Sequence, residues 1–330
     1  MAVVISAGLT GVVRWLALRH GLLDVPNQRS SHSAPTPRGG GVAIVIASGI
    51  ALTLLGSAGA MEPRLVAALL GGGITVAMIG FLDDRRRLSA TVRLAVHAAA
   101  ALWALLILGG VPAVQVGNHL VEFGWSGWVI GTLAIIWVLN LFNFMDGIDG
   151  IAAAEAVFVA IAGALVSSQS DTGMSTFRGA IVFGAACLGF LGWNWAPAKI
   201  FMGDVGSGFL GYVIAVLAIA SARDNPTALL SWLILGGVFF CDATVTLIRR
   251  MLRGEGASQA HRTHAYQWLA RRWHSHQRVT NAVLAINICW LFPWALFASK
   301  HPVLAAWSAA AALAPLLILA FFTGAGRSET

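Results

Sequence analysis

The chain has 330 residues, of which 58% are hydrophobic and only 11% are charged, and its mean hydropathy is +0.77. An ordinary water-soluble domain carries about 25% charged residues, so this composition excludes that class and the class of disordered chains. The net charge of +7 does not predict a nucleic-acid partner, because Lys and Arg gather in the cytoplasmic loops of membrane proteins.

Apolar segments long enough to cross a membrane recur along the whole chain. A transmembrane helix needs about 20 mostly apolar residues, and about eleven windows meet that condition. They cover approximately residues 2–20, 40–60, 64–82, 92–109, 126–144, 150–168, 177–195, 207–222, 227–247, 280–298 and 303–322. The sequence therefore predicts an all-α, polytopic integral membrane bundle, in which residues 1–330 form a single transmembrane domain.

The basic residues predict how this bundle is oriented. When the N-terminus lies outside, sixteen of the 21 Lys and Arg residues fall on the cytoplasmic side, four fall outside, and Arg14 lies within a span. This asymmetry favours an outside N-terminus. The hydrophilic stretch 248–279 is then cytoplasmic, and Trp268, Leu269 and Trp273 among its arginines predict a helix on the membrane surface.

The acidic residues gather on the same predicted side. Carboxylates at the ends of apolar helices cost free energy, so a group of them is a candidate functional site. With cations, histidines and glycines on the same face, such a group suits an anionic substrate bound through a metal ion. We therefore expect the active site on the cytoplasmic face, where these acids fall: Asp24, Asp83, Asp84, Asp146, Asp149, Asp204, Asp242 and Glu255.

The first cytoplasmic loop, residues 24–41, is rich in turn-forming residues and hydrogen-bond donors, among them Arg38. Such a loop either closes over a ligand or is only a connector.

The pair Asp83-Asp84 ends the third predicted span, directly before Arg85, Arg86 and Arg87. Neighbouring residues at a helix end point to different sides. One carboxylate is therefore expected to serve the chemistry while the other pairs with an arginine. A surface cluster of weak, exposed ion pairs explains the same residues equally well.

The segment Asn143-Phe-Met-Asp146-Gly-Ile-Asp149-Gly150 follows an apolar run. If it is helical, Asn143, Asp146 and Asp149 lie near one face, because residues three apart are neighbours on a helix. The two glycines allow a turn or a close approach of a ligand to the backbone. The alternative is a short loop with aspartates that cap helices.

A glycine-rich segment, which contains Asn194, Gly203, Asp204 and Ser207, precedes the eighth span. Gly and Ser at a helix start expose backbone N–H groups, which form a natural seat for phosphate. Asp204 beside them can hold Mg²⁺, which typically uses one or two carboxylates together with substrate phosphates. A glycine-rich turn with an aspartate cap is the alternative.

His261, Arg262 and His264 lie close together in the long basic stretch. Two histidines at this spacing could ligate zinc, but no third ligand stands nearby in the sequence. With Arg262 between them, they indicate a phosphate or nucleotide contact. A basic interfacial stretch without a catalytic role is the alternative.

Taken together, these segments resemble the polyprenyl-phosphate N-acetylhexosamine-1-phosphate transferases, which form glycosyltransferase family 4. This family transfers a sugar 1-phosphate from a UDP-sugar to undecaprenyl phosphate and releases UMP. Its members need Mg²⁺, which Mn²⁺ can replace. The motifs that carry the resemblance are Pro26-Asn27-x-Arg29 with Pro35-Thr36-Pro37-Arg38-Gly39-Gly40, Asp83-Asp84, Asn143-x-x-Asp146-Gly-x-Asp149-Gly, Asn194 with Gly203-Asp204-Val-Gly-Ser207, and His261-Arg262-x-His264.

The resemblance implies a role for each matching residue. One of Asp83 and Asp84 deprotonates or positions the lipid phosphate. Asp204 ligates the metal, with Asn143 as a further ligand or nucleotide contact. The other expected substrate contacts are Asp146, Asp149, Asn194, Gly203, Ser207, His261, Arg262, His264 and Arg38.

The last motif also bears on the branch of the family. The peptidoglycan enzyme carries consecutive histidines there, whereas Arg262 and Thr263 interrupt them in this chain. This favours the branch that initiates O-antigen, with UDP-N-acetylglucosamine or a 6-deoxy acetamido sugar as donor. The phospho-MurNAc-pentapeptide transferase of peptidoglycan synthesis is the alternative.

A lipid or solute transporter is an alternative from another class, but it would need ionisable residues at mid-span, where Arg14 is almost alone. The resemblance further implies a multi-pass protein of the bacterial inner (cytoplasmic) membrane, in contact with membrane lipid. It is also compatible with a homodimer.

Overall fold

The computed structural model describes residues 1–26, 34–86, 88–167, 173–256 and 261–328. In its first half the elements are α1 (Ala2–Arg19), β1 (Leu23–Asp24), β2 (Thr36–Pro37), α2 (Gly41–Ser57), α3 (Pro63–Arg86), α4 (Ala90–Leu108), β3 (Val114–Val116), β4 (His119–Val121), α5 (Ser126–Met145) and α6 (Ile151–Ser167). In its second half they are α7 (Met174–Asn194), α8 (Asp204–Asp224), α9 (Ala228–Leu235), α10 (Gly237–Leu252), α11 (Ala265–Trp273), α12 (His276–Ile286), the π-helical turn η1 (Asn287–Leu291), α13 (Phe292–Lys300), η2 (Pro302–Leu304) and α14 (Ala305–Thr323).

The helices confirm the prediction of an all-α, multi-pass membrane protein. Among the described residues, eight helical segments are long and apolar enough to cross a membrane. The pair α9–α10, bent by 75°, makes a ninth if it counts as one span, and α2 and α6 are apolar but have only 17 residues each. Every one of the eleven predicted windows thus coincides with helix, although by length only eight or nine qualify.

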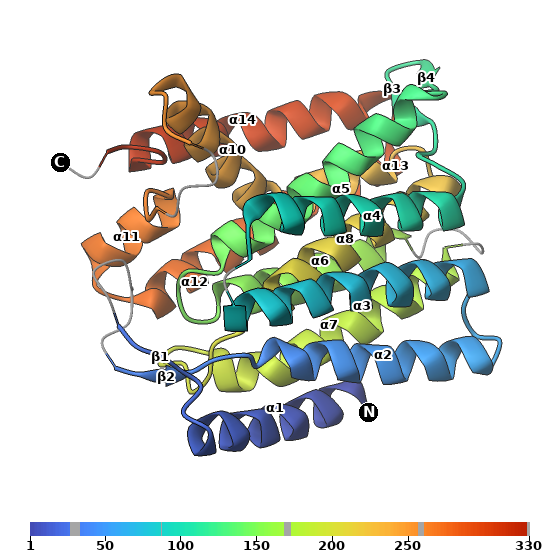
Figure 1. Cartoon of the computed structure of the whole chain (residues 1–330). Coiled ribbons are helices and arrows are strands. Elements are labelled where there is room, and N and C mark those ends of the chain that lie inside the picture. Colours follow the sequence, from blue (N-terminus) through green and yellow to red (C-terminus); the bar gives the residue numbers. More distant parts are fainter. Residues whose placement is uncertain (27–33, 87, 168–172, 257–260, 329–330) are drawn as a thin grey trace.

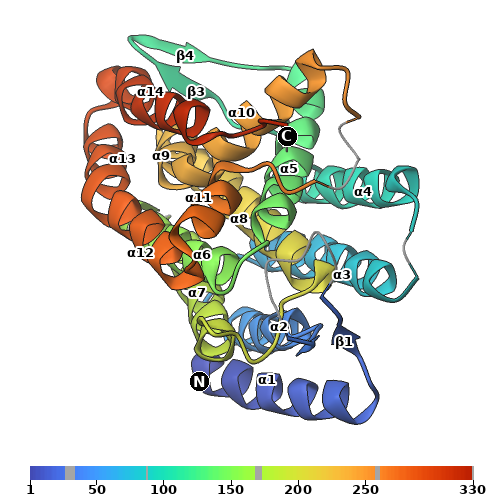
Figure 2. The same cartoon turned by 90° about the vertical axis from the view of Figure 1, so that its left-hand side faces the viewer.

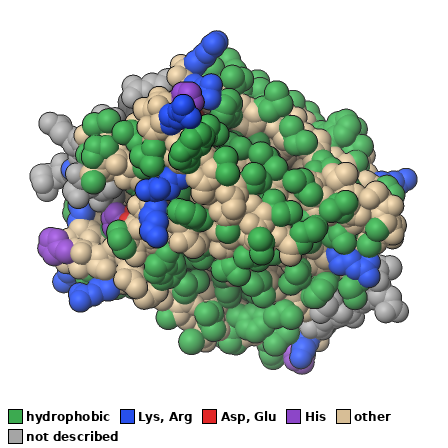
Figure 3. Space-filling model, turned by 90° about the horizontal axis from the view of Figure 1, so that it is seen from below, with side chains coloured by type: hydrophobic (Ala, Val, Ile, Leu, Met, Phe, Trp, Pro, Cys, Tyr) green, Lys and Arg blue, Asp and Glu red, His purple; other side chains and the backbone are tan. Residues whose placement is uncertain are grey.

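The polar segments gather at one end of the bundle. Figure 1 shows β1, β2 and α11 at the left-hand end and the β3–β4 hairpin at the opposite end. We call the end with β1, β2 and α11 the polar end, and Figure 2 looks onto it. In Figure 3 the middle of the visible face is hydrophobic and most Lys and Arg side chains lie towards its edges. This distribution is what a bilayer requires of a spanning bundle. That the polar end faces the cytoplasm stays a prediction.

Helix α8 forms the centre of the bundle. Residues 205–222 are all buried, and α3 and α5 pack against them most extensively (Figure 1). Helices in a membrane gain little from hydrophobic association and instead rely on small residues that let backbones approach closely. Gly211 of α8 has this function, because a Cβ there would lie 2.6 Å from the Cα of Leu139 in α5.

Gly80 brings α3 equally close to the start of α8. A Cβ at Gly80 would lie 2.6 Å from the carbonyl carbon of Asp204 and 2.7 Å from the amide nitrogen of Val205. Both of these are backbone atoms, so no side chain can rotate to make room. The distance between the end of α3 and the start of α8 therefore depends on a residue without a side chain.

We expect Gly80→Ala to separate these two helix ends and to destabilise the protein by about 1–3 kcal/mol, the usual cost of overpacking. Thermal unfolding of the detergent-solubilised protein measures this loss. Gly49→Ala in α2 is the matched control, because its nearest atom would be the Cδ2 of Leu70 at 4.0 Å. Equal melting temperatures for the two variants would contradict the proposed role of Gly80.

Candidate active site

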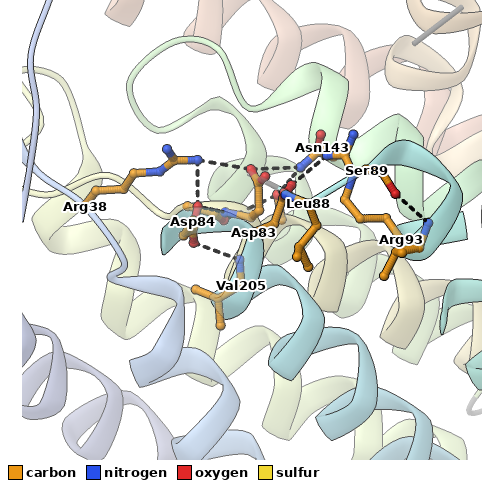
Figure 4. A network of polar contacts seen from close by, with 12 residues as sticks. Arg38, Asp83, Asp84, Leu88, Ser89, Arg93, Asn143 and Val205 are labelled. Atoms are coloured by element: carbon orange, nitrogen blue, oxygen red, sulfur yellow. Dashed lines mark hydrogen bonds and ion pairs between the residues drawn. The ribbon is translucent and has the colours of Figure 1, made fainter. Parts of the chain in front are cut away.

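Three helix ends meet at the polar end and carry the acidic and amide side chains of the predicted site. The C-terminal end of α3 provides Asp83 and Asp84, the end of α5 provides Asn143, and α8 begins with Asp204. Figure 4 shows Asp83, Asp84 and Asn143 side by side in one network of polar contacts. The structure therefore brings together residues that lie up to 121 positions apart in the sequence.

The first loop adds Arg38 to this group. The N–H of Gly40 donates to the carbonyl of Phe201 at 2.9 Å, and the N–H of Phe201 donates to the carbonyl of Pro37 at 2.8 Å. These backbone bonds hold the segment around Arg38 against the segment that leads into α8. Of the first-loop motif, Asn27 and Arg29 lie outside the described residues.

Asp84 caps the first turn of α8 from another helix. Its Oδ1 accepts a hydrogen bond from the N–H of Asp204 at 3.0 Å, and its Oδ2 accepts one from the N–H of Val205 at 3.3 Å. The residue at the N-cap position of α8 is Gly203, with φ +78°, and a Cβ there would lie 2.6 Å from Asp84 Oδ2. Gly203 therefore suits both the backbone conformation and the approach of Asp84.

This cap corrects the expectation that Gly203 and Ser207 offer open backbone N–H groups to a phosphate. Asp84 already accepts from the first two N–H groups of α8, and the N–H of Ser207 donates to the carbonyl of Gly203 at 3.1 Å. The donors at this helix start are engaged within the protein, because the carboxylate of α3 takes the place that a phosphate would need.

Asp83 points to the other side of the helix end. Its Oδ1 accepts from the N–H of Leu88 at 2.6 Å, and its Oδ2 lies 2.7 Å from Nη1 of Arg93 on α4. Arg38 lies 2.6 Å from Asp84 (Figure 4). Each carboxylate thus has an arginine of its own, whereas the sequence led us to expect one such pair.

Asp204 is the most exposed of the three carboxylates, with 27% of its side chain accessible. Its Oδ1 lies 3.2 Å from Nη2 of Arg38 and accepts from Nδ2 of Asn143 at 3.2 Å. The same Nδ2 donates to the Oγ of Ser207 at 3.0 Å, and Ser207 itself is buried. Asn143 is therefore held by α8, with its amide oxygen not used by these two bonds.

The charges at this point interact strongly. Burial opposes the charge on Arg38, but the carboxylates of Asp84 and Asp204 outweigh that effect and raise the pKa of its guanidinium above the usual value. Burial, followed by the charge of Asp204, raises the pKa of the Asp146 carboxyl well above its usual value. Because these acids repel one another, the site favours any cation that comes within reach of them.

A cavity of about 310 Å³ opens beside these groups. Asp83, Asp204, Asn143 and Arg93 lie on its wall, whereas Asp84 does not. The rest of the wall is mostly apolar and comes from α3, α4, α5, α8 and α10, with Val76, Ile79, Leu94, Trp137, Leu139, Phe144 and Leu247. The cavity therefore combines a charged part with an apolar part, and of the aspartate pair Asp83 faces it.

The oxygen atoms around this cavity fit a hard divalent cation. Among the described residues, no three His, Cys, Asp or Glu side chains come close enough together to hold a metal by themselves. Mg²⁺ does not need such a cage, because it usually binds one or two carboxylates and completes its shell with water and substrate phosphates. Asp204 has a carboxylate of this kind on the cavity wall, and Asn143 lies beside it with its Nδ2 directed at that carboxylate.

A second pocket, of about 570 Å³, lies where α11 and α12 meet the segment after α7. Arg262, Asp149 and Gln267 line it, together with Ala196, Pro197, Ala270, Arg271, His274, Ser275, His276 and Gln277. Asp149 is fixed there, because its Oδ2 accepts from the N–H of Ala198 at 3.1 Å and its Oδ1 lies 3.3 Å from Nδ1 of His276. This pocket is polar, and the cationic side chains of Arg262 and Arg271 line it.

The predicted helical face of Asn143, Asp146 and Asp149 is wrong. Helix α5 ends at Met145, and the chain then turns, with φ +77° at Gly150. Asn143 points to Asp204, whereas Asp149 lies at the second pocket. The alternative of a short loop, which the sequence left open, describes this segment better.

Asn194 acts on the same turn from the end of α7. Its side chain is buried, its Oδ1 accepts from the N–H of Gly150 at 3.1 Å, and its Nδ2 donates to the carbonyl of Ile200 at 2.9 Å. Asn194 therefore ties the turn after α5 to the segment before α8.

The predicted histidine group lies next to the end of α5. The rings of His261 and His264 stack with their centroids 5.0 Å apart, and the ring of Phe144 lies 6.2 Å from that of His264. His264 is buried, whereas Arg262 lines the second pocket. A nine-residue helix, α11, follows within the predicted interfacial stretch, and its contact with a membrane surface stays a prediction.

The sequence analysis assigned no individual role to several residues of this region. Arg93 and His97 both line the cavity, and their i, i+4 spacing on one helix was a signal that they share a face. His276 and Asp242 contact Asp149 and His264 respectively, and no periodic pattern links the members of either pair.

Comparison with known proteins gives the class to which this arrangement belongs. The profile of Glycosyl transferase family 4 matches residues 66–222. The "Probable undecaprenyl-phosphate N-acetylglucosaminyl 1-phosphate transferase" of Bacillus subtilis is 32% identical over 275 residues, which cover 82% of this chain and 75% of that protein. The "Decaprenyl-phosphate N-acetylglucosaminephosphotransferase" of Mycobacterium tuberculosis is 32% identical over 312 residues, which cover 84% and 76%. The "Phospho-N-acetylmuramoyl-pentapeptide-transferase" of Gloeothece citriformis is 29% identical over 263 residues, 72% and 68%.

The apolar helices and these relatives together define a multi-pass membrane enzyme that transfers phosphosugars. The chain belongs to glycosyl transferase family 4, the polyprenyl-phosphate sugar-phosphate transferases. The resemblance seen in the sequence is thereby confirmed at the level of the family. Proteins named for N-acetylglucosaminyl 1-phosphate transfer and for phospho-N-acetylmuramoyl-pentapeptide transfer both occur among the relatives.

We expect Asp84→Ala to destabilise the protein by about 1–2 kcal/mol, because the first turn of α8 loses the acceptor for two N–H groups. The melting temperature of the purified protein measures this loss. Asp224→Ala, at the exposed far end of the same helix, is the control and should leave the melting temperature nearly unchanged. Equal melting temperatures for the two variants would show that Asp84 does not stabilise α8.

Proposed function

We propose that this protein transfers an N-acetylhexosamine 1-phosphate from a UDP-sugar to undecaprenyl phosphate and releases UMP. The reaction initiates a cell-surface polysaccharide such as O-antigen, in the inner membrane of a bacterium. The product is a lipid-linked sugar diphosphate.

One observation carries this proposal: a single cavity has carboxylates and an arginine on one part of its wall and apolar side chains on the rest. A polyprenyl phosphate has the same division, with an anionic head and a hydrocarbon tail. Arg93 at the charged part suits the phosphate, and Leu94, Trp137 and Leu247 suit the first part of the tail. A water-soluble phosphate acceptor would gain nothing from these apolar side chains.

In the reaction, an oxygen of the acceptor phosphate attacks the β-phosphorus of the UDP-sugar. The bond between that phosphorus and the bridging oxygen breaks, and UMP leaves with the bonding electrons. Two anions must meet, so most of what a protein can contribute is positioning and charge neutralisation. Asp83 faces the cavity and, in this proposal, orients the acceptor phosphate or takes its proton, while Arg93 holds Asp83 in place.

Asp204 and Asn143 are the proposed ligands of Mg²⁺, or of Mn²⁺ in its place. The ion, when bound, neutralises the diphosphate of the donor and the charge that develops on UMP. Arg38 contacts both Asp84 and Asp204 and so keeps these carboxylates from repelling each other. The donor lies towards the second pocket, whose wall includes Arg262 and Asp149. Asp146 contacts the donor nearer the metal ligands in this proposal, because Asp204 is the charged group that acts on it most strongly.

Two features support an N-acetylhexosamine without a peptide. The relatives named for N-acetylglucosamine transfer cover 82% to 87% of this chain, whereas those named for the pentapeptide substrate cover 65% to 72%. The interrupted histidines of the last motif point in the same direction. The pentapeptide-bearing sugar is the alternative donor, because both groups of relatives show similar identity.

A panel of donors tests the proposal. With purified protein, Mg²⁺ and undecaprenyl phosphate, we expect UMP release and a lipid product from UDP-N-acetylglucosamine or a related acetamido sugar. UDP-MurNAc-pentapeptide should give little or none. Product from the pentapeptide donor alone would overturn the proposed branch, and no UMP from any donor would overturn the proposed function.

We expect Asp204→Ala to reduce transfer at least about 100-fold, because the proposed metal site loses its exposed carboxylate. The variant should still insert in the membrane and should bind Mn²⁺ more weakly by electron paramagnetic resonance. Glu122→Ala, an exposed acid just after β4 at the opposite end of the bundle, is the control. Full activity of the Asp204 variant would sink the metal assignment.

A further inference from the structure

We propose that Asp242 is a positioning residue for the transfer reaction, which it supports by holding the His264 ring and the start of α11 against the active site. This inference rests on the proposed function. Nothing in the motif pattern links Asp242 with His264, which lies 22 residues further along the chain.

Asp242 lies within α10, where its side chain is buried. Its Oδ1 lies 3.3 Å from Nδ1 of His264 and accepts from the N–H of Ala265 at 2.9 Å, and its Oδ2 accepts from the N–H of Tyr266 at 3.0 Å. The carboxylate of α10 therefore caps α11, much as the carboxylate of Asp84 caps α8. Thr246, one turn further along α10, donates its hydroxyl to Oδ1 at 3.1 Å.

These bonds explain why a charged group is stable inside the protein. An ionised carboxylate is costly to bury unless several donors replace the water it loses. Two backbone N–H groups at a helix start are suitable donors, because the helix dipole also favours a negative charge there. Together with the side chain of Gln267, which accepts from the N–H of His264 at 3.2 Å, Asp242 therefore holds the start of α11 in place.

The same contact determines which atom of the His264 ring remains for substrate. A carboxylate beside Nδ1 restricts the orientation of the imidazole. The other nitrogen, Nε2, is buried and has no hydrogen-bond partner among the described residues. Buried polar atoms are nearly always paired, so an unpaired one in a candidate active site indicates a place for a ligand atom.

The surroundings of the ring connect it with the first cavity. His264 lies beside the ring of Phe144, and Phe144 lines the cavity that contains Asp83 and Asp204. The ligand class proposed for Nε2 at this place is the phosphate of the nucleotide-sugar donor, which must lie between the acceptor and the second pocket. A phosphate oxygen only accepts, so this contact requires a ring with a proton on both nitrogens, in which Nδ1–H donates to Asp242 and Nε2–H donates to the phosphate.

Asp242 acts on α5 as well. Asp242 accepts a hydrogen bond from the N–H of Tyr266, and the hydroxyl of Tyr266 donates to the carbonyl of Phe144 at 3.0 Å. Gly147 leaves room for the Tyr266 ring because it has no Cβ. Figure 2 shows α10, α11 and the end of α5 close together at the polar end. Asp242 thus joins α10 to the helix whose end carries Asn143.

A double-mutant cycle in the full-length enzyme tests the inference. We expect Asp242→Asn to lower kcat/KM for the UDP-sugar donor about 10- to 100-fold, by analogy with removal of the carboxylate partner of a metal-ligating histidine. The KM for undecaprenyl phosphate should stay unchanged, because the acceptor part of the cavity does not involve Asp242. Asp242→Glu keeps the charge and should restore part of the lost activity.

The cycle is completed by His264→Asn alone and combined with Asp242→Asn. If Asp242 acts through His264, the double variant should be no less active than His264→Asn. Thr246→Val removes one bond to Asp242 but keeps the carboxylate, and as the matched control it should cost less than Asp242→Asn.

Each remaining outcome overturns something specific. Wild-type activity in Asp242→Asn, or losses that multiply in the double variant, would overturn the positioning role while the proposed function stands. A wild-type enzyme that releases no UMP from any donor would overturn the proposed function, and the inference with it. If Asp242→Asn does not fold, the same double-mutant cycle with Asp242→Glu tests whether Asp242 acts through His264.

Discussion

The hydrogen bonds from the start of α8 to the carboxylate of Asp84 are the interaction on which the rest of the structure depends. A helix that begins inside a protein leaves N–H groups without partners, and leaving them unpaired there costs free energy. Gly203 has no side chain to offer, so the acceptor comes from α3. Because the capped turn begins with Asp204, the group that completes the fold and the proposed metal ligand are neighbours. This group of repelling acids is tolerated in part because Asp83, Asp84 and Asp204 each also accept a hydrogen bond from the protein.

The sequence predicts the helices well because the membrane imposes one simple condition on each of them. Every apolar window became helix, and the residues singled out at Asp83, Asp84, Asn143 and Asp204 do meet. Hydropathy says nothing of where a backbone bends, so the window 227–247 hid the 75° bend between α9 and α10. The helical face expected for residues 143–149 failed for a similar reason, since α5 ends at Met145.

Contacts between distant segments are what periodicity leaves out. Two carboxylates cap helix starts in this protein, Asp84 that of α8 and Asp242 that of α11. Only Asp84 lies in a recognisable motif. In the sequence, Asp242 looks like a single acid in an apolar helix. Two of its partners are backbone N–H groups, which any residue other than proline provides, so the sequence does not mark them. Both caps join helices that come together only in the folded chain, so a reader of the sequence can recognise the candidate ligands before the groups that hold them.

The backbone contact at Gly80 makes the spacing of the acids independent of the side chains on the outer surface of the bundle. Since α3 and α8 meet there without side chains, the spacing of the acids does not depend on the residues that face the lipid. Side chains such as Leu106, which is 65% exposed, and Leu133, which is 61% exposed, lie on the outer surfaces of α4 and α5. They are free to be exchanged for longer or shorter apolar residues. The same reaction centre could therefore be carried into bilayers of different thickness or lipid composition by changes on the outside alone.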